Sequence, residues 1–268
     1  FQSGIFDSQD PRRVGPDTQF EIGSITKVFT ALLLAESERL GKVSRNDPAA
    51  KYLLPPDDPD QAALAKITLL SLATHTSGLP RLPSNLSLRP ETASDPYAAY
   101  DRAALITGFR LGGRTAVAGV KVDYSNFGAS VLGEALAAAW GTTYADALRE
   151  RVLLPLSLKT TTLGIAGTSP PANLAPGHAA GKRVPNWTSL ACAPAVAMRS
   201  STRELANFLA ACLGGKEQPL RAAFAATMLL RVLILWLPLL PGMWLMRSVL
   251  RDKEGCNDEK PAGSPQRI

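Results

Sequence analysis

The sequence predicts an α/β (α+β) fold in which helices dominate and strands are few. Apolar residues recur at helical spacing in several stretches, whereas only the first 20 residues are typical of strand and turn. With 46% hydrophobic and 19% charged residues, the composition is that of a globular protein. A chain of 268 residues is long enough for a substantial core and one or two domains.

The first third of the chain contains the clearest helix. Asp10-Pro11 and Gly15-Pro16 break the strand-and-turn region at 1–20. A broad apolar face at 28–36 then predicts a buried helix that ends near Gly41, a plausible C-cap. The following segment is rich in proline and aspartate, which predicts a surface loop over 42–59.

Further helices and loops alternate along the rest of the chain, without an internal repeat. Helix at 201–213 is predicted to begin at a Ser201 or Thr202 cap, with Glu204 in its first turn. The other predicted elements are a short helix at 67–73, a turn at 77–80, an irregular stretch at 82–96, helices at 97–109, 127–140 and 141–153, and a long loop at 166–194 that could line a cleft.

Charge and composition argue against several classes of protein. The net charge is +6, but basic residues are not interleaved with aromatic ones, and we expect no nucleic-acid partner. Three widely spaced cysteines and two distant histidines predict neither a disulfide framework nor a metal site, and we expect no metal or cofactor. The chain has no G-x-S-x-G elbow for a Ser-His-Asp triad. His75 is expected to hydrogen-bond within its own turn.

An S-x-x-K tetrad at the start of the 28–36 helix suggests chemistry. Ser24 and Lys27 are three residues apart, which puts them on one helical face about a turn from each other. A serine hydroxyl becomes a useful nucleophile when a neighbouring base takes its proton, and a helix N-terminus favours developing negative charge. The alternative is that Ser24 is a helix N-cap and Lys27 a solvated residue of the first turn.

A second motif lies 100 residues after the serine. Tyr124-Ser125-Asn126 precedes a predicted helix. The side chains of Tyr124 and Asn126 either belong to a catalytic site or only hydrogen-bond the backbone of their own turn. Together with 19–27, 67–80 and 199–209, this motif resembles the class C β-lactamase-related serine hydrolases of the β-lactamase and penicillin-binding protein superfamily. The resemblance runs from about Gln19 to Gly215.

This resemblance implies both a fold and an activity. The fold would be β-lactamase/transpeptidase-like, with the helical region largely present and the antiparallel sheet incomplete. Ser24 would attack an amide or ester carbonyl, Lys27 and Tyr124 would share proton abstraction, and Asn126 would orient the substrate amide and steady Lys27. An adjacent ammonium would favour the Tyr124 phenolate. The substrate would be a β-lactam, a D-Ala peptide or a small ester, in the periplasm or outside the cell.

The two ends of the chain depart from this family pattern. Only 23 residues precede Ser24, so the N-terminus is expected to be incomplete. We divide the chain into a partial β-lactamase-related domain at 1–215 and a divergent apolar and basic tail at 216–268, in which no Lys-Thr-Gly or His-x-Gly motif is found. The alternative function is therefore an inactive family remnant or a binding module.

An apolar run in the tail makes membrane contact a further expectation. The run spans 228–250, and its charge-free part of 15 residues would extend about 23 Å as a helix, short of the roughly 30 Å hydrocarbon core. Arg231 and Arg247 could snorkel. The alternatives are a buried helix or a tail derived from truncation or a shifted reading frame, and we favour the last because only the preceding residues follow the family.

Overall fold

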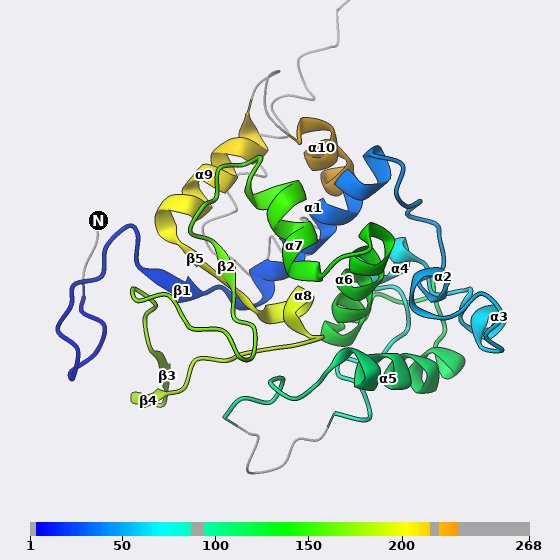
Figure 1. Ribbon diagram of the computed structural model, residues 1–268, viewed down its shortest axis with the longest axis horizontal. Coiled ribbons are helices and arrows are strands. Elements are labelled where there is room, and N and C mark those ends of the chain that lie inside the picture. Colours follow the sequence, from blue (N-terminus) through cyan, green and yellow to red (C-terminus); the bar gives the residue numbers. More distant parts are fainter. Residues whose placement is uncertain (1–3, 87–93, 215–219, 230–268) are drawn as a thin grey trace, which may run out of the picture.

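The computed structural model describes residues 4–86, 94–214 and 220–229, which fold into the predicted mixture of many helices and a small antiparallel sheet (Figure 1). The strands are β1 Gln19–Glu21, β2 Thr162–Leu163, β3 Gly177–Ala179, β4 Lys182–Val184 and β5 Met198–Ser201. The helices are α1 Thr26–Arg39, α2 Ala50–Leu53, α3 Gln61–Leu64, α4 Leu69–Ala73, α5 Arg102–Thr115, α6 Asn126–Trp140, α7 Tyr144–Leu148, α8 Ala193–Val196, α9 Thr202–Leu213 and α10 Arg221–Leu229. Single turns η1 Gly23–Ile25 and η3 Arg149–Leu153 precede α1 and follow α7, respectively.

The principal sheet places the start of α1. Its strand order is β1-β5-β2, and both pairings are antiparallel, with Phe20 opposite Ser200. The chain leaves β1 through the Ile22 N–H, which donates to the Met198 carbonyl at 3.0 Å, and turns at Gly23 with φ +51°. A positive φ is readily adopted by glycine, so the strand can pass directly into η1 and α1.

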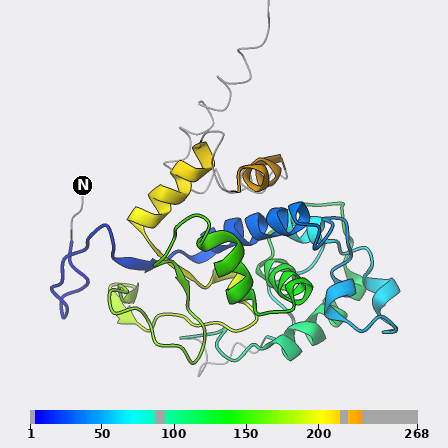
Figure 2. The same cartoon turned by 45° about the horizontal axis from the view of Figure 1, so that its top comes forward.

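Helix α1 is buried on all sides from Thr26 to Ser37, with a central run of apolar residues at 31–35, and other helices pack around it. Figure 2 shows α10 on one side of it and α6 on the other. On the α10 side, the ring of Phe29 lies 4.3 Å from that of Phe208, which lies 5.6 Å from that of Phe224. All three rings are buried. Helix α1 ends at Arg39, followed by Gly41 at φ +69°, which confirms the predicted terminus.

Helix caps account for several boundaries that the sequence predicts. Ser201 accepts a hydrogen bond from the Glu204 N–H and is therefore the cap of α9, of the two candidates. Ser125 caps α6 in the same way by accepting from the Gly128 N–H at 2.8 Å, and α6 ends before Gly141 at φ +64°. These side chains satisfy backbone N–H groups that have no partner within the first helical turn.

Three boundaries differ from the predictions. The expected surface loop at 42–59 contains α2, whose neighbourhood contributes buried apolar residues to the core. The helix expected at 97–109 starts instead at Arg102, since Asp101 accepts from the Ala104 N–H and caps it. The loop at 166–194 includes the β3–β4 hairpin. Four-residue helices and three-residue strands are too short to show a periodic pattern in the sequence.

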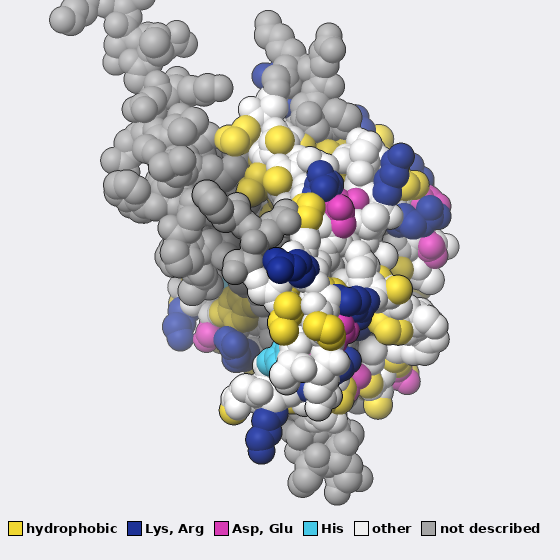
Figure 3. Space-filling model, turned by 90° about the vertical axis from the view of Figure 1, so that its left-hand side faces the viewer, with side chains coloured by type: hydrophobic (Ala, Val, Ile, Leu, Met, Phe, Trp, Pro, Cys, Tyr) yellow, Lys and Arg dark blue, Asp and Glu magenta, His cyan; other side chains and the backbone are white. Residues whose placement is uncertain are grey.

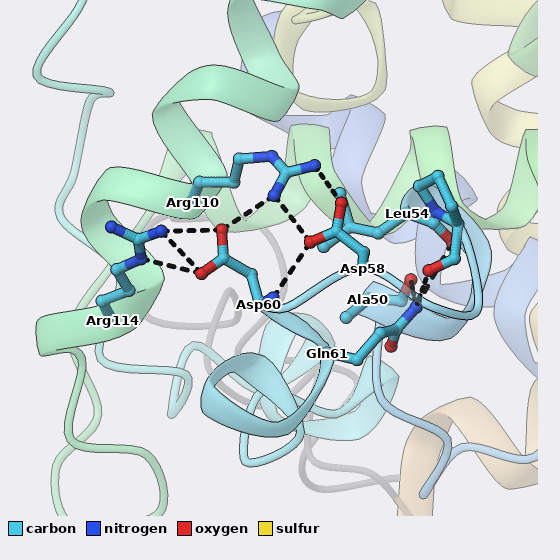
Figure 4. Close-up of polar contacts among 8 residues, drawn as sticks. Ala50, Leu54, Asp58, Asp60, Gln61, Arg110 and Arg114 are labelled. Atoms are coloured by element: carbon cyan, nitrogen blue, oxygen red, sulfur yellow. Dashed lines mark hydrogen bonds and ion pairs between the residues drawn. The ribbon is translucent and has the colours of Figure 1, made fainter.

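An ion-pair cluster joins the start of α3 to α5 (Figure 4). Arg110 donates to both Asp58 and Asp60, and Arg114 binds Asp60 through its Nε at 2.9 Å. The hydrogen bonds from the two arginines hold the pKa of Asp60 below its ordinary value. The cluster fixes the position of α5 relative to the turn that follows α2.

The predicted tail is described only in part. Helix α10 belongs to the 216–268 segment and packs on α1, while the boundary at 215 stays a prediction. The apolar run at 228–250, with its expected membrane contact, lies outside the described residues except for the last two positions of α10. Among the helices that are described, none has both the length and the apolar character required to cross a bilayer. On the face drawn in Figure 3, Lys and Arg side chains are scattered among hydrophobic and acidic ones.

Candidate active site

Ser24 lies in η1, between β1 and α1, and its hydroxyl meets two of the side chains that the sequence singles out. The Ser24 Oγ is 2.6 Å from the Tyr124 hydroxyl and 3.0 Å from the Lys27 Nζ. Ser24 does not occupy the capping position of α1, which is Ile25. The interpretation of Ser24 as an N-cap is therefore wrong, and its hydroxyl shares one site with an amine three residues further on and a phenol 100 residues further on.

Lys27 is buried, contrary to the alternative of a solvated first-turn lysine. Its side chain is one turn into α1, the residue is 4% exposed, and its Nζ donates to the Ala195 carbonyl of α8 at 2.8 Å. Burial, with a smaller effect from the positive charge of Arg81, lowers the pKa of Lys27 from the ordinary 10.5 to about 7. A large fraction of Lys27 is therefore a neutral amine near pH 7, which is the form that can accept a proton.

Tyr124 reaches the serine from the segment that precedes α6. Burial raises the pKa of Tyr124, although the hydrogen bond with Ser24 and the charge of Arg81 act in the opposite direction. A nearby positive charge does favour the phenolate, as expected, but here desolvation outweighs it, so the net pKa is raised and the side chain is a phenol near neutral pH. Its ring lies 4.9 Å from the Lys27 Nζ and 4.9 Å from the Arg81 Cζ.

Asn126 is the first residue of α6, two positions after Tyr124. Its backbone N–H donates to the Arg81 carbonyl at 3.0 Å. Within the described part of the chain, its Oδ1 is a buried oxygen that accepts no hydrogen bond. Since a buried polar atom without a partner is costly, this oxygen has capacity for a ligand donor. Its role in substrate binding stays a prediction.

His75 is a component of the site that the sequence did not identify. Its ring is buried against Tyr124, with 4.8 Å between ring centroids. Its Nδ1 accepts a hydrogen bond from the Ser125 N–H at 3.2 Å, so the ring reaches beyond the turn in which its hydrogen bond was expected. Burial, with a smaller contribution from Lys27, lowers its pKa to about 4, so the ring is neutral at physiological pH. A small cavity lies beside it, lined also by Lys27 and Thr30.

Main-chain carbonyls of the segment 75–81 accept hydrogen bonds from the residues that follow Tyr124. The Arg81 carbonyl accepts from the Phe127 N–H at 3.2 Å, and the Pro80 carbonyl accepts from the Ser125 hydroxyl at 2.6 Å. The Arg81 side chain is exposed at the rim of the site. The Ala195 carbonyl and these main-chain contacts leave no signal in a sequence, because any residue carries the same backbone groups. For Arg81, only its place directly after the Ser77–Pro80 turn could have attracted notice.

The described residues hold no group of three or more His, Cys, Asp or Glu side chains arranged to bind a metal ion. The free thiols of Cys192 and Cys212 are not joined in a disulfide. At Ser24, the groups available for proton transfer are the hydroxyl itself, the Lys27 amine and the Tyr124 phenol.

Comparison with known proteins identifies relatives with the same fold. The profile of the β-lactamase family matches residues 2–234. The chain is 34% identical to the D-alanyl-D-alanine-carboxypeptidase/endopeptidase AmpH of Escherichia coli K12 over 151 residues, which are 54% of this chain and 37% of that protein. It is 28% identical to a β-lactamase of Pseudomonas fluorescens over 231 residues, covering 85% of this chain and 60% of the relative.

Solved structures agree with these relatives. A class C β-lactamase from Rhodobacter sphaeroides superposes with a TM-score of 0.67 and 26% identity, covering 84% of this chain and 60% of that one. The D-alanine carboxypeptidase AmpC from Burkholderia cenocepacia gives a TM-score of 0.66 at 26% identity, covering 85% and 58%. The chain thus spans between about one third and three fifths of the length of these proteins.

Proposed function

The chain belongs to the β-lactamase family, and we propose that it is a serine hydrolase that forms an acyl-enzyme on Ser24. The observation that carries the proposal is the meeting of the Ser24 hydroxyl with a buried amine at 3.0 Å and a phenol at 2.6 Å. These are the groups that a serine needs to lose its proton and to deliver one to a leaving group.

In the proposed acylation step, Lys27 is the base. Its neutral Nζ accepts the hydroxyl proton of Ser24 while the Oγ forms a bond to the substrate carbonyl carbon. The bond from that carbon to the leaving nitrogen or oxygen then breaks, and Tyr124 donates its phenolic proton to the leaving atom. The Lys27 ammonium supplies the proton that restores the phenol. A pKa of about 7 suits Lys27 to this exchange near neutral pH.

Deacylation completes the cycle. Water attacks the ester carbonyl, the bond to the Ser24 Oγ breaks, and one proton of the water returns to that oxygen. The net reaction adds water across an amide or ester bond, without a metal or cofactor taking part. Ser24 lies in the first helical turn, where backbone N–H groups without intrahelical partners favour the developing oxyanion.

The names of the relatives support a proposal for the substrate class. AmpH is named as a D-alanyl-D-alanine-carboxypeptidase/endopeptidase, the AmpC of Burkholderia cenocepacia as a D-alanine carboxypeptidase, and other relatives as β-lactamases. We therefore propose D-Ala peptides of the peptidoglycan type, β-lactams or small esters as substrates, met in the periplasm or outside the cell. Asn126, with its unpartnered Oδ1, is proposed to accept a hydrogen bond from the substrate amide.

Covalent labelling tests the proposal directly. A fluorophosphonate or a fluorescent penicillin should label the wild-type protein on the peptide that contains Ser24, and Ser24→Ala should remove the label. Ser37→Ala is the matched control, because Ser37 lies near the far end of α1, where its hydroxyl donates to the Leu33 carbonyl and accepts from the Trp140 Nε1, and its loss should leave labelling intact. If neither probe labels protein that circular dichroism shows to be folded, the alternative of an inactive remnant or binding module is correct.

A further inference from the structure

We propose that His75 is the positioning residue for Tyr124, holding the phenol against Ser24 by binding the backbone on both sides of it. This inference rests on the proposed function, because it concerns the group that donates the proton there. His75 itself lies against Tyr124 rather than at the reacting atoms.

Two hydrogen bonds from one residue flank the tyrosine. The His75 carbonyl accepts from the Asp123 N–H at 2.7 Å, and its Nδ1 accepts from the Ser125 N–H at 3.2 Å. Tyr124 is the residue between these two anchors. Its ring also packs on the imidazole at 4.8 Å. Because the backbone before and after Tyr124 is held, the direction of its side chain toward Ser24 is constrained from three sides.

The backbone of His75 is in a conformation that residues other than glycine seldom adopt. Its φ is +57°, in the left-handed region where a Cβ comes close to the following carbonyl oxygen. Such a conformation persists where surrounding contacts determine it, and it is common at functional sites. In the same turn segment, the Pro80 and Arg81 carbonyls accept hydrogen bonds from the start of α6 and hold the His75 turn against it. The strained turn is what allows the carbonyl and the ring of one residue to face the same neighbouring segment.

The chemistry of the imidazole fits an acceptor. An Nδ1 that accepts a hydrogen bond carries no proton, so the neutral ring has its proton on Nε2. Lys27 from α1 and Tyr124 itself are the titratable groups that act on or contact the ring, and Arg81 lies over the neighbouring Tyr124 ring. Burial, aided by the nearby Lys27, keeps the pKa of His75 at about 4, and the acceptor is therefore retained across the neutral range.

A pair of substitutions separates the acceptor from the rest of the ring. In His75→Asn the amide oxygen stands where Nδ1 stands, two bonds beyond the Cβ, and asparagine tolerates positive φ. In His75→Gln the oxygen lies one atom further out and cannot replace Nδ1. The measured quantity is the second-order rate of Ser24 labelling by a fluorophosphonate, with melting temperature as the folding control. His75→Asn should stay within about 3-fold of wild type, and His75→Gln should be about 10–100-fold slower.

Repeating the measurement with Tyr124→Phe shows whether His75 acts through Tyr124. The His75→Gln loss should shrink to less than about 3-fold when Tyr124→Phe is also present, since there is no phenol left to position. A purely structural role would give the same loss in both backgrounds, and that result would overturn the inference. Should His75→Gln fail to fold, a folded His75→Asn that is more than 10-fold slower in both backgrounds would overturn it too. Absence of labelling in the wild type would instead remove the proposed function.

Discussion

Lys27→Met is expected to abolish labelling of Ser24 and, at the same time, to stabilise the protein near neutral pH. The amine is 4% exposed, and its pKa falls from 10.5 to about 7 in the folded state. At 1.36 kcal/mol per pH unit, a lysine that is protonated in the unfolded chain destabilises the fold by about 5 kcal/mol. Methionine has a similar length and carries no charge, so this destabilisation disappears.

The gain is partly offset by lost hydrogen bonds. Removing the amine leaves the buried Ala195 carbonyl without its donor, which costs about 1–3 kcal/mol. We therefore expect Lys27→Met to be about 2–4 kcal/mol more stable than wild type at pH 6. The folded state binds fewer protons than the unfolded state between pH 7 and 10.5, so wild-type stability rises with pH over that window. Below pH 7 the difference between the two proteins should be constant.

Urea denaturation at several pH values measures this difference. The midpoints of wild type and Lys27→Met should converge as the pH rises above 7 and then cross at or before about pH 10, because wild type gains about 1.36 kcal/mol per pH unit in this window. Lys121→Met is the matched control, because the Lys121 side chain is 78% exposed and its loss should change stability by less than about 0.5 kcal/mol. If Lys27→Met is less stable than wild type at pH 6, with a difference that does not vary with pH, the argument for a buried, readily neutralised amine is wrong.

Three further predictions follow from other contacts. The rate of Ser24 labelling should increase through pH 7 as Lys27 loses its proton. Arg81→Gln should shift this rise to higher pH, because removing a nearby positive charge raises the pKa of Lys27. Labelling rates measured over pH 5–9, with Arg81→Lys as the control, test both expectations. Phe224→Ala should lower the free energy of unfolding, measured in urea, by about 3–5 kcal/mol if α10 is part of the folded domain. An unchanged urea midpoint would show that α10 does not contribute to the core. Gly78→Ala should lower the melting temperature, since φ is +72° and a Cβ would lie 2.7 Å from the Val117 nitrogen; an unaltered melting temperature would contradict this packing.

The sequence predicted the family fold and the principal site because both depend on side chains with strong local signals. Ser24 and Lys27 are recognisable by their spacing, and Tyr124 by its place before a helix. Long helices such as α6 and α9 were located within two residues, since their caps are polar side chains. These features are local in the chain, and they can be found without knowing what lies nearby in space.

The remaining features depend on contacts between distant segments. Burial of Lys27 by α8 sets its pKa, and no pattern near residue 27 indicates that α8 will cover it. The same applies to Tyr124, whose pKa moved in the direction opposite to expectation because burial dominates. His75 was assigned a local hydrogen bond, but its partner lies 50 residues further along. Short elements such as α2 were missed because four residues show no period.

The bond between Lys27 and the Ala195 carbonyl joins positions 168 residues apart. Until that later stretch of polypeptide has docked on α1, the amine is hydrated, keeps its proton and cannot activate the neighbouring hydroxyl. A nascent or misfolded chain would consequently carry an inert serine, and its reactivity would emerge only on completion of tertiary structure. The fraction of molecules labelled by a covalent probe would then equal the correctly folded fraction, so labelling would measure the refolding yield.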